Sequence, residues 1–338
     1  MKKVKVQDAV GLTLCHDITA MRDGFKGAAF KRGHVIEEGD VEKLLDLGKR
    51  TVFIWEENAG EIHEEDAARR MAAMAQVDGC HYTEPSEGKV LLMADTRGMF
   101  RVDTALLNRV NSIGDLTIST LPDHFPVEAG DRLASMRIVP LVTQETQILE
   151  AERLCQGKKL LDLRPYHARK AGVIITGSEI YHGRIKDKFE TVARAKLAQY
   201  PSEIVGVAIC DDDLEMIVSE GKKLLDAGAE LLIFSGGMSV DPDDLTPTAI
   251  RALGADVISY GVPSQPGNMT LVAYLGDVAL LGVPGAAISR PTTMFDVLLP
   301  QLFTGDKLTK EDLVRLGDGG LCHMCDTCHF PNCTFGRY

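Results

Sequence analysis

The 338-residue chain lacks long apolar runs and any excess of positive charge. No stretch approaches the roughly 18 consecutive apolar residues that a membrane-spanning helix needs, and the opening ten residues lack the apolar core of a secretory signal. We therefore expect a cytoplasmic protein. The formal net charge of −12 argues against a nucleic-acid partner, because proteins that bind a phosphate backbone usually carry a basic face.

Several common catalytic motifs are also missing. The sequence has no P-loop, no G-x-G-x-x-G dinucleotide fingerprint and no G-x-S-x-G nucleophile elbow. The acidic balance does not exclude a small anionic ligand, because backbone amides and helix dipoles hold such ligands locally.

The hydrophobic pattern divides the chain into three parts. Residues 1–165 predict an α+β domain with a β-rich part. Its expected helices are 41–47, 62–76 and part of 145–163, and its expected strands are 51–55, 89–93, 116–120 and 136–142. Residues 166–305 predict an α/β domain, and residues 306–338 form a cysteine-rich tail.

Strands and helices alternate in the second part. The expected strands are 173–176, 204–209, 231–234, 257–260 and 279–283. The expected helices are 187–200, 213–227, 246–253 and 288–299, with Thr246 as an N-cap and Pro247 in the first turn. This order predicts a three-layer fold with a mostly parallel sheet, which binds ligands at the carboxyl ends of its strands.

The most distinctive turn, Ser235-Gly236-Gly237-Met238-Ser239, follows the expected strand at 231–234. Its glycines allow a tight turn that presents N–H groups to an anion, and its serines add hydroxyl donors. Asp244 follows, where a carboxylate can hold a cation or position a nucleophile. The alternative is an ordinary strand-to-helix turn.

Other turns follow the neighbouring strands. Thr176-Gly177-Ser178-Glu179 follows the first strand, and Asp211-Asp212-Asp213 follows the second. The aspartates suit either Mg²⁺ or a solvated loop. Pro266-Gly267 and Pro284-Gly285 form two more turns.

These five motifs, in this order, resemble the molybdopterin-binding domain shared by molybdopterin adenylyltransferases, molybdopterin molybdotransferases and gephyrin. The resemblance implies that Asp212 and Asp244 are catalytic, holding Mg²⁺ or placing molybdate for insertion into the dithiolene. It also implies cofactor binding by Thr176, Gly177, Glu179, Ser235, Gly236, Gly237, Ser239, Pro266, Gly267, Pro284, Gly285 and Ser289.

The sequence departs from that family at two turns. Asn268 replaces the lysine of the family's PGKP turn, and Ala286-Ala287 replaces the Asn-Pro of its LPGNP turn. Arg290 is one nearby residue that could supply the missing charge, or it is an ordinary surface residue. Toward the N-terminus, Asp8-Ala9-Val10-Gly11 weakly resembles the opening of the molybdotransferase branch.

Four of the eight cysteines crowd the tail, as Cys322, Cys325, Cys328 and Cys333. Four thiolates over 12 residues can surround one metal ion or cluster, and zinc and an iron–sulfur cluster fit the pattern equally well. A disordered tail is the alternative. Gly317, Gly319 and Gly320 predict a flexible tether before the cysteines.

Three functions remain open. The first is a molybdopterin-binding protein of molybdenum cofactor biosynthesis, similar to molybdotransferases, that inserts molybdenum from molybdate into free or adenylylated molybdopterin. The second is a non-catalytic carrier or sensor, whose tail binds metal or a partner such as a molybdoenzyme or another cofactor-assembly protein. The third is a nucleotide hydrolase similar to competence-damage proteins. Because relatives of this domain form dimers or trimers, we expect a homo-oligomer.

Overall fold

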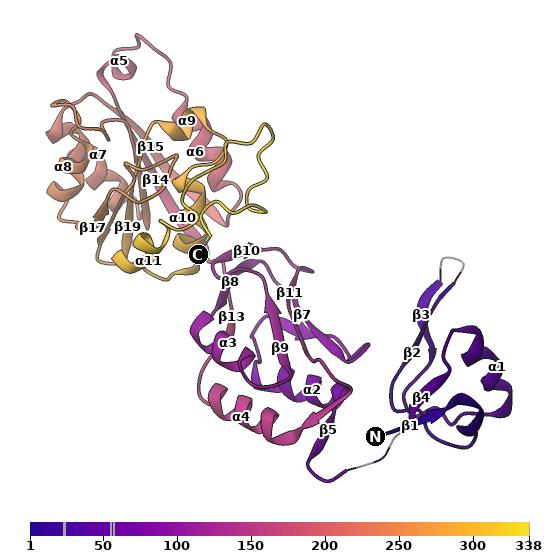
Figure 1. Cartoon of the computed structure of the whole chain (residues 1–338). Coiled ribbons are helices and arrows are strands. Elements are labelled where there is room, and N and C mark those ends of the chain that lie inside the picture. The colour runs from indigo at the N-terminus through magenta and orange to yellow at the C-terminus, as the bar shows by residue number, and fades with distance from the viewer. Residues whose placement is uncertain (23–24, 55, 57, 338) are drawn as a thin grey trace. The chain divides into compact units, whose positions relative to one another are not determined.

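The computed structural model describes residues 1–22, 25–54, 56 and 58–337 (Figure 1). The chain forms two compact units. The first contains Met1–Asp95, Val102–Leu121 and Gly130–Asp162, and the second contains Thr96–Arg101, Pro122–Ala129 and Leu163–Tyr338. The second unit therefore includes two segments, 96–101 and 122–129, that precede the single boundary expected at residue 165.

The first unit is built from small antiparallel sheets and short helices. Strand β1, Lys2–Lys5, pairs with β4, Thr51–Ile54. Strand β2, Ile18–Arg22, pairs with β3, Phe25–Phe30. A four-stranded sheet has the order β6-β7-β11-β9, formed by Cys80–Tyr82, Lys89–Ala94, Arg132–Ile138 and Leu116–Thr120. Strands β5 and β12 also pair, at Glu61–His63 and Val142–Gln144.

The expected helices of this unit are confirmed, with shifted ends. They are α1, α2 and α4, which span Glu38–Asp46, Glu64–Met74 and Glu145–Cys155. A further helix, α3 at Thr104–Asn111, was not predicted. The strands expected at 51–55, 89–93 and 116–120 are also present, although residue 55 lies outside the described residues. The strand expected at 136–142 is divided between the end of β11 and the start of β12.

The second unit contains the predicted α/β sheet. Its order is β15-β14-β16-β19-β18-β17, formed by Ser202–Cys210, Arg169–Thr176, Leu231–Ser235, Val278–Val283, Leu271–Leu275 and Asp256–Tyr260. The first four strands are parallel, and β18 is antiparallel to both of its neighbours. The mostly parallel sheet is confirmed, and β18 is a strand that we did not predict.

Alternating side chains place this sheet between two cores. Val173, Ile175 and Ile233 lie in a core with residues of α6 and α10, Phe189–Leu197 and Met294–Thr304. Ile174 and Phe234 lie in a core with residues of α7 and α8, Leu214–Asp226 and Thr246–Ala252. The three layers follow from side chains of a buried strand that point alternately to its two faces.

The helix expected at 288–299 is interrupted. Helix α9 spans Ala286–Ser289, and α10 begins only at Met294. Thr293 caps α10 through a reciprocal pair of hydrogen bonds with Asp296, since its backbone N–H donates to Asp296 Oδ2 at 2.8 Å. A Thr-x-x-Asp pattern starts a helix in this way, and Pro291 disfavours a helical residue before it.

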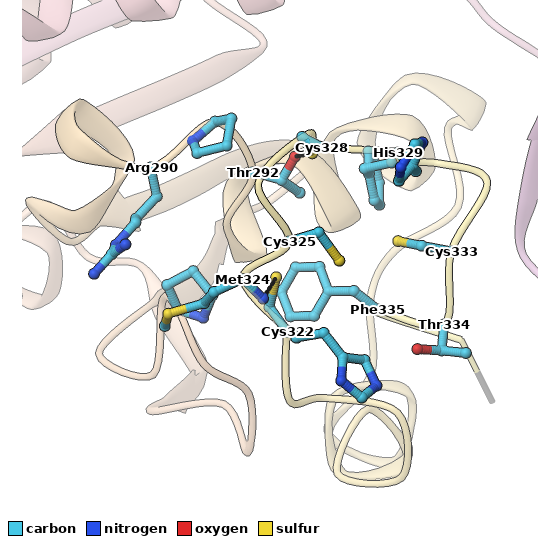
Figure 2. Close-up of a pocket in the computed structure, with 14 residues that line it drawn as sticks. Arg290, Thr292, Cys322, Met324, Cys325, Cys328, His329, Cys333, Thr334 and Phe335 are labelled. Atoms are coloured by element: carbon cyan, nitrogen blue, oxygen red, sulfur yellow. Dashed lines mark hydrogen bonds between the residues drawn. The ribbon is translucent and has the colours of Figure 1, made fainter.

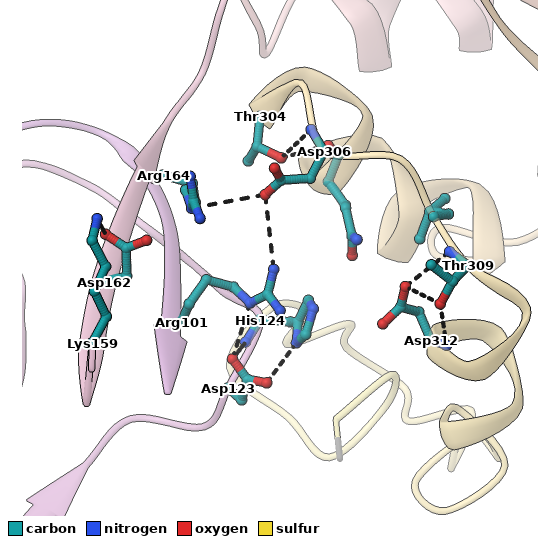
Figure 3. A network of polar contacts seen from close by, with 12 residues as sticks. Arg101, Asp123, His124, Lys159, Asp162, Arg164, Thr304, Asp306, Thr309 and Asp312 are labelled. Atoms are coloured by element: carbon teal, nitrogen blue, oxygen red, sulfur yellow. Dashed lines mark hydrogen bonds and ion pairs between the residues drawn. The ribbon is translucent and has the colours of Figure 1, made fainter. Parts of the chain in front are cut away.

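A small sheet has the order β10-β8-β13, formed by Phe125–Val127, Gly98–Val102 and Leu161–Pro165. Its residues 98–101, 125–127 and 163–165 belong to the second unit. Asp306, just after α10, lies 4.0 Å from Arg101 Nη1 and 3.8 Å from Arg164 Nε (Figure 3). Arg101 Nε also donates to Asp123 at 3.2 Å. These charges link two strands of the sheet to the end of α10.

The tail packs on the α/β fold. After α11, Lys310–Arg315, the chain forms a β-bridge at Leu321 and buries Phe335 to 2% exposure in the core that contains α10. A Cβ atom at Gly319 would lie 2.4 Å from the Arg337 carbonyl oxygen, and one at Gly320 would lie 2.2 Å from that of Leu316. The predicted flexible tether is therefore wrong, because these glycines allow close backbone packing. None of the described helices is long and apolar enough to cross a membrane.

The docked tail leads to a stability prediction. Phe335→Ala should lower the unfolding free energy of the second unit by about 3 kcal/mol, because it leaves a cavity in a packed core. Urea denaturation would measure the change. Leu321→Ala, which removes a side chain that is 71% exposed, should change stability by less than about 0.5 kcal/mol. Equal stability of both variants and the unmodified protein would contradict the docked tail.

Candidate functional site

The five predicted motifs gather at one edge of the sheet. Thr176 pairs with Cys210, and Ser235 pairs with both Ile175 and Val283, so the turns after β14, β15, β16 and β19 leave from neighbouring strand ends. Leu271, the first residue of β18, pairs with Gly282, so the turn containing Pro266 and Gly267 lies at the same edge. A ligand at this edge would therefore meet all five turns.

A contact between three residues holds the central turn. Thr246 Oγ1 donates to the Gly236 carbonyl at 2.8 Å and lies 3.2 Å from Thr176 Oγ1. Both threonines are buried, at 0% and 2% exposure. Gly236 has a φ of +92°, and a Cβ there would lie 2.0 Å from the Thr176 carbonyl oxygen. This close approach requires glycine.

The expected N-cap role of Thr246 is wrong. The cap position of α8 belongs to Leu245, without a side-chain cap, and Thr246 is the first helical residue. Its hydroxyl donates instead to the carbonyl of Gly236, a contact that only the folded sheet brings about. Pro247 lies in the first turn, as expected.

The loop after this turn is fixed at both ends. Tyr260 Oη, from the end of β17, lies 2.9 Å from each of the Met238 and Ser239 carbonyl oxygens. The Asp241 N–H donates to Asp244 Oδ2 at 2.9 Å, which orients that carboxylate. Burial, followed by the charge of Asp244, raises the pKa of Tyr260, so its hydroxyl remains a donor. Tyr260 was not predicted, although it ends a strand at the same edge.

The three aspartates after β15 have different roles. Asp213 caps α7 by accepting the Met216 N–H at 2.7 Å, and Asp211 accepts the Asp212 N–H at 2.9 Å. Asp212 Oδ2 accepts the Ser178 N–H at 2.9 Å, which joins the turns after β14 and β15.

The electrostatic surroundings of Asp212 disfavour its charge. Burial raises the pKa of its carboxyl, as do the nearby charges of Glu179, Asp211 and Asp243, whereas the Ser178 N–H lowers it. A carboxylate in such surroundings gains stability when a cation binds beside it.

The remaining predicted residues are less closely joined. Glu179, Ser289 and Gly285 are exposed, and Pro284 is half-buried. Gly267 packs so closely that a Cβ there would lie 2.8 Å from Met294 Cβ. Asn268, which replaces the family's lysine, donates from Nδ2 to the Val262 carbonyl at 3.0 Å, so it stabilises its own turn.

The part of the chain that the structure describes shows no preformed metal site at these turns. Among the described residues, no group of three or more His, Cys, Asp or Glu side chains lies close enough to hold a metal ion. Arg184 and Lys186, two cations that could replace the missing lysine, are exposed after α5, Ser178–Tyr181. Arg290 is also exposed, but it lines a cavity formed with the tail.

Comparison with known proteins finds similarity over the part of the chain that carries these turns. Residues 172–304 match the family model of a probable molybdopterin binding domain. These residues belong to the molybdopterin-binding domain family. Residues 3–56 match a domain of unknown function.

The similar curated proteins match only this part of the chain. Molybdopterin molybdenumtransferase from Bacillus subtilis (strain 168) is 28% identical over 121 residues, which cover 34% of this chain and 28% of that protein. A CinA-like protein from Mycobacterium sp. (strain JLS) is 32% identical over 90 residues, covering 26% of this chain and 21% of its own. The match thus spans less than a third of either relative.

Similar solved structures include a molybdopterin biosynthesis enzyme, MoaB from Thermus thermophilus, with 21% identity and a TM-score of 0.35. It covers 41% of this chain and 98% of its own. A tungsten cofactor synthesizing MoaB from Pyrococcus furiosus has 19% identity and a TM-score of 0.35, with 40% and 93% of the two chains covered.

The close approach at Gly236 can be tested directly. Gly236→Ala should lower the unfolding free energy by more than about 1 kcal/mol, because L-residues disfavour a positive φ and the new methyl group would meet backbone. Gly285→Ala is the matched control at the same edge, because a Cβ there meets no atom within 4 Å. Thermal or urea unfolding of both variants would measure the difference, and equal losses would contradict the contact.

The raised pKa of Asp212 predicts a pH-dependent stability. Its ionised form is disfavoured in the folded state, so the destabilisation is present at neutral pH and disappears as pH falls below the unfolded pKa of about 3.9. Asp212→Asn, which keeps an acceptor for Ser178, should therefore be more stable than the unmodified protein at pH 7, with the gain shrinking toward pH 4. Urea unfolding across this range would measure it, and a gain that grew with acidification would contradict the assignment.

Proposed function

We propose that the carboxyl edge of the α/β sheet binds molybdopterin or its molybdenum-loaded form. The observation that supports this best is the glycine turn fixed by Thr176 and Thr246 within the molybdopterin-binding domain. Gly236 and Gly237 are half-buried and have no side chain to cover their backbone, which suits a terminal phosphate on their amides. The exposed Ser239 adds a hydroxyl donor.

Asp212 and Asp244 are the residues proposed to handle metal. Mg²⁺ uses one or two carboxylates together with substrate phosphate, so it needs no preformed group of three side chains. Asp212 stands in negative surroundings that a cation would relieve, and Asp244 is oriented by the Asp241 N–H. When bound, molybdopterin supplies the dithiolene sulfurs that accept molybdenum, and the two carboxylates would hold Mg²⁺ or place molybdate beside them.

A carrier or sensor of finished cofactor is the second candidate. Asn268 favours it, because its amide donates to the Val262 carbonyl at the position where the family has a lysine. A site with fewer positive charges to bind molybdate is better suited to holding finished cofactor than to inserting molybdenum. The two candidates share the same binding edge and differ only in turnover.

Turnover separates these candidates. With adenylylated molybdopterin, molybdate and Mg²⁺, we expect the full-length protein to bind the pterin and form molybdenum cofactor. Asp244→Asn keeps the acceptor for Asp241 but removes the charge, and should lower turnover by more than about 10-fold while pterin binding remains. Asp244→Ala also removes the acceptor, so it should lower both.

Each outcome has a clear meaning. Binding without turnover by the unmodified protein would favour the carrier, and full turnover by Asp244→Asn would remove the proposed role of its charge. Failure to bind molybdopterin would overturn the proposal. Hydrolysis of a nucleotide such as ADP-ribose with no pterin requirement would favour the hydrolase similar to competence-damage proteins.

A further inference from the structure

The four tail cysteines line one cavity. Pro266, from one of the turns that we propose to bind the pterin, lines the same cavity. The cavity has a volume of about 120 Å³, and its walls include Cys322, Cys325, Cys328 and Cys333 on the tail side (Figure 2). Arg290 and Thr292 also line this cavity. All four cysteines are free thiols, and those of Cys325 and Cys333 point toward one another in Figure 2.

Contacts with the domain fix this segment at its start and middle. The Gln265 N–H donates to the Gly320 carbonyl at 2.8 Å, and the Cys322 N–H donates back to the Gln265 carbonyl at 2.8 Å. Cys328 Sγ lies 3.1 Å from Thr292 Oγ1. The backbone of Cys322 and the thiol of Cys328 therefore contact the folded domain.

The far end of the segment is fixed by a half-buried arginine. Arg337 stacks on the rings of Phe125 and Phe330, at 4.4 and 5.5 Å, and donates to the Pro331 carbonyl at 2.6 Å. Its positive charge is close enough to attract an ionised Cys333. Arg337 therefore places a cation near one of the four thiols.

We propose that the four thiolates bind a single Zn²⁺, and that this ion stabilises the turns at Pro266 and Thr292. Zn²⁺ prefers four ligands in a tetrahedron, and the cavity presents four sulfurs and room for one ion. Binding replaces four S–H bonds with four Zn–S bonds and releases four protons to solvent, with no change of oxidation state. The product carries a charge of −2, which Arg337 partly offsets.

The thiols must close around the ion, because no such group already lies at coordination distance in the described residues. The segment can do so, since residues 322–333 contain no helix or strand. Metal binding would therefore order this segment further.

The residues that contact the tail, Gln265 and Thr292, lie close in sequence to two of the turns proposed to bind the pterin. Gln265 directly precedes Pro266, whose carbonyl accepts the Met294 N–H at 3.2 Å. Thr292 lies between α9, which follows the Pro284-Gly285 turn, and α10. Zinc and molybdopterin should therefore bind cooperatively, an expectation that rests on the proposed function. Such coupling acts equally in both directions.

Metal content is the first test. Metal-free full-length protein, prepared without oxygen, should bind one Zn²⁺ per chain, and Cys325→Ser should lower the affinity by more than about 10-fold. Cys325 is exposed, so its loss should not unfold the protein, and Cys80→Ser in the first unit is the matched control. The zinc site would be overturned if no Zn²⁺ bound, or if Cys325→Ser bound Zn²⁺ with equal affinity. It would also be overturned if the purified protein contained iron and sulfide and showed visible charge-transfer absorption.

Hydrogen exchange tests the coupling without the pterin. Zinc should slow exchange of the Gln265, Cys322 and Met294 amides in the unmodified protein but not in Cys325→Ser. Unchanged exchange at Gln265 and Met294 would overturn the coupling. With molybdopterin, zinc should tighten binding by about 5-fold or more. If zinc binds and protects the turns but molybdopterin never binds, the proposed function fails and the zinc site stands.

Discussion

The approach of Gly236 to the carbonyl of Thr176 is the contact on which the proposed binding edge depends. Two neighbouring parallel strands end there, and a side chain on the glycine would push their turns apart. Because the hydroxyl of Thr246 does not cap α8, it can donate to the Gly236 carbonyl. Helix α8 is thereby fastened to the turn, and the loop that carries Asp244 has a defined start and end.

The protein can be acidic overall and still bind an anion, because backbone N–H groups would contact the anion and carboxylates would contact a cation. Backbone N–H groups face an anion without any net positive charge, so the glycine turn does not need a basic surface. Burial, together with the nearby charges of Glu179, Asp211 and Asp243, disfavours the ionised form of the Asp212 carboxyl. In the proposed site, a divalent cation would offset that penalty and bridge the carboxylate and a phosphate, so that cation binding and anion binding would support each other.

The sequence predicted those features that depend on neighbouring residues. The four parallel strands and their glycine turns were foreseen, since apolar runs and the punctuation after them are local signals. Strand β18 was missed, although Gly276-Asp277 between it and β19 is a two-residue hairpin signal. The interruption before α10 could likewise have been read from Thr293 and Asp296.

Features that depend on distant parts of the chain were not foreseen. The hydrogen bonds from Tyr260 to the loop after β16 join residues that are 22 and 21 positions apart. Thr246 looked like a cap because nothing in its own neighbourhood reveals Gly236 as a competing acceptor. The glycines before the cysteines looked like a tether, but the carbonyls they approach, at Leu316 and Arg337, are specified by the fold of the tail.

The exposure of the cysteine loop gives a physical reason for the proposed metal site. Leu313, Leu316 and Phe335 anchor its two ends in the core, at 3% exposure or less. Between these anchors, residues 323–329 are all exposed, so this loop buries almost no apolar surface that could offset the entropy of ordering it. Four metal–sulfur bonds can supply the free energy needed to order this loop, as they do in other small metal-stabilised folds. Since the same loop touches Thr292 and follows the bridge to Gln265, the ion that orders it would also hold the edge where the pterin is proposed to bind.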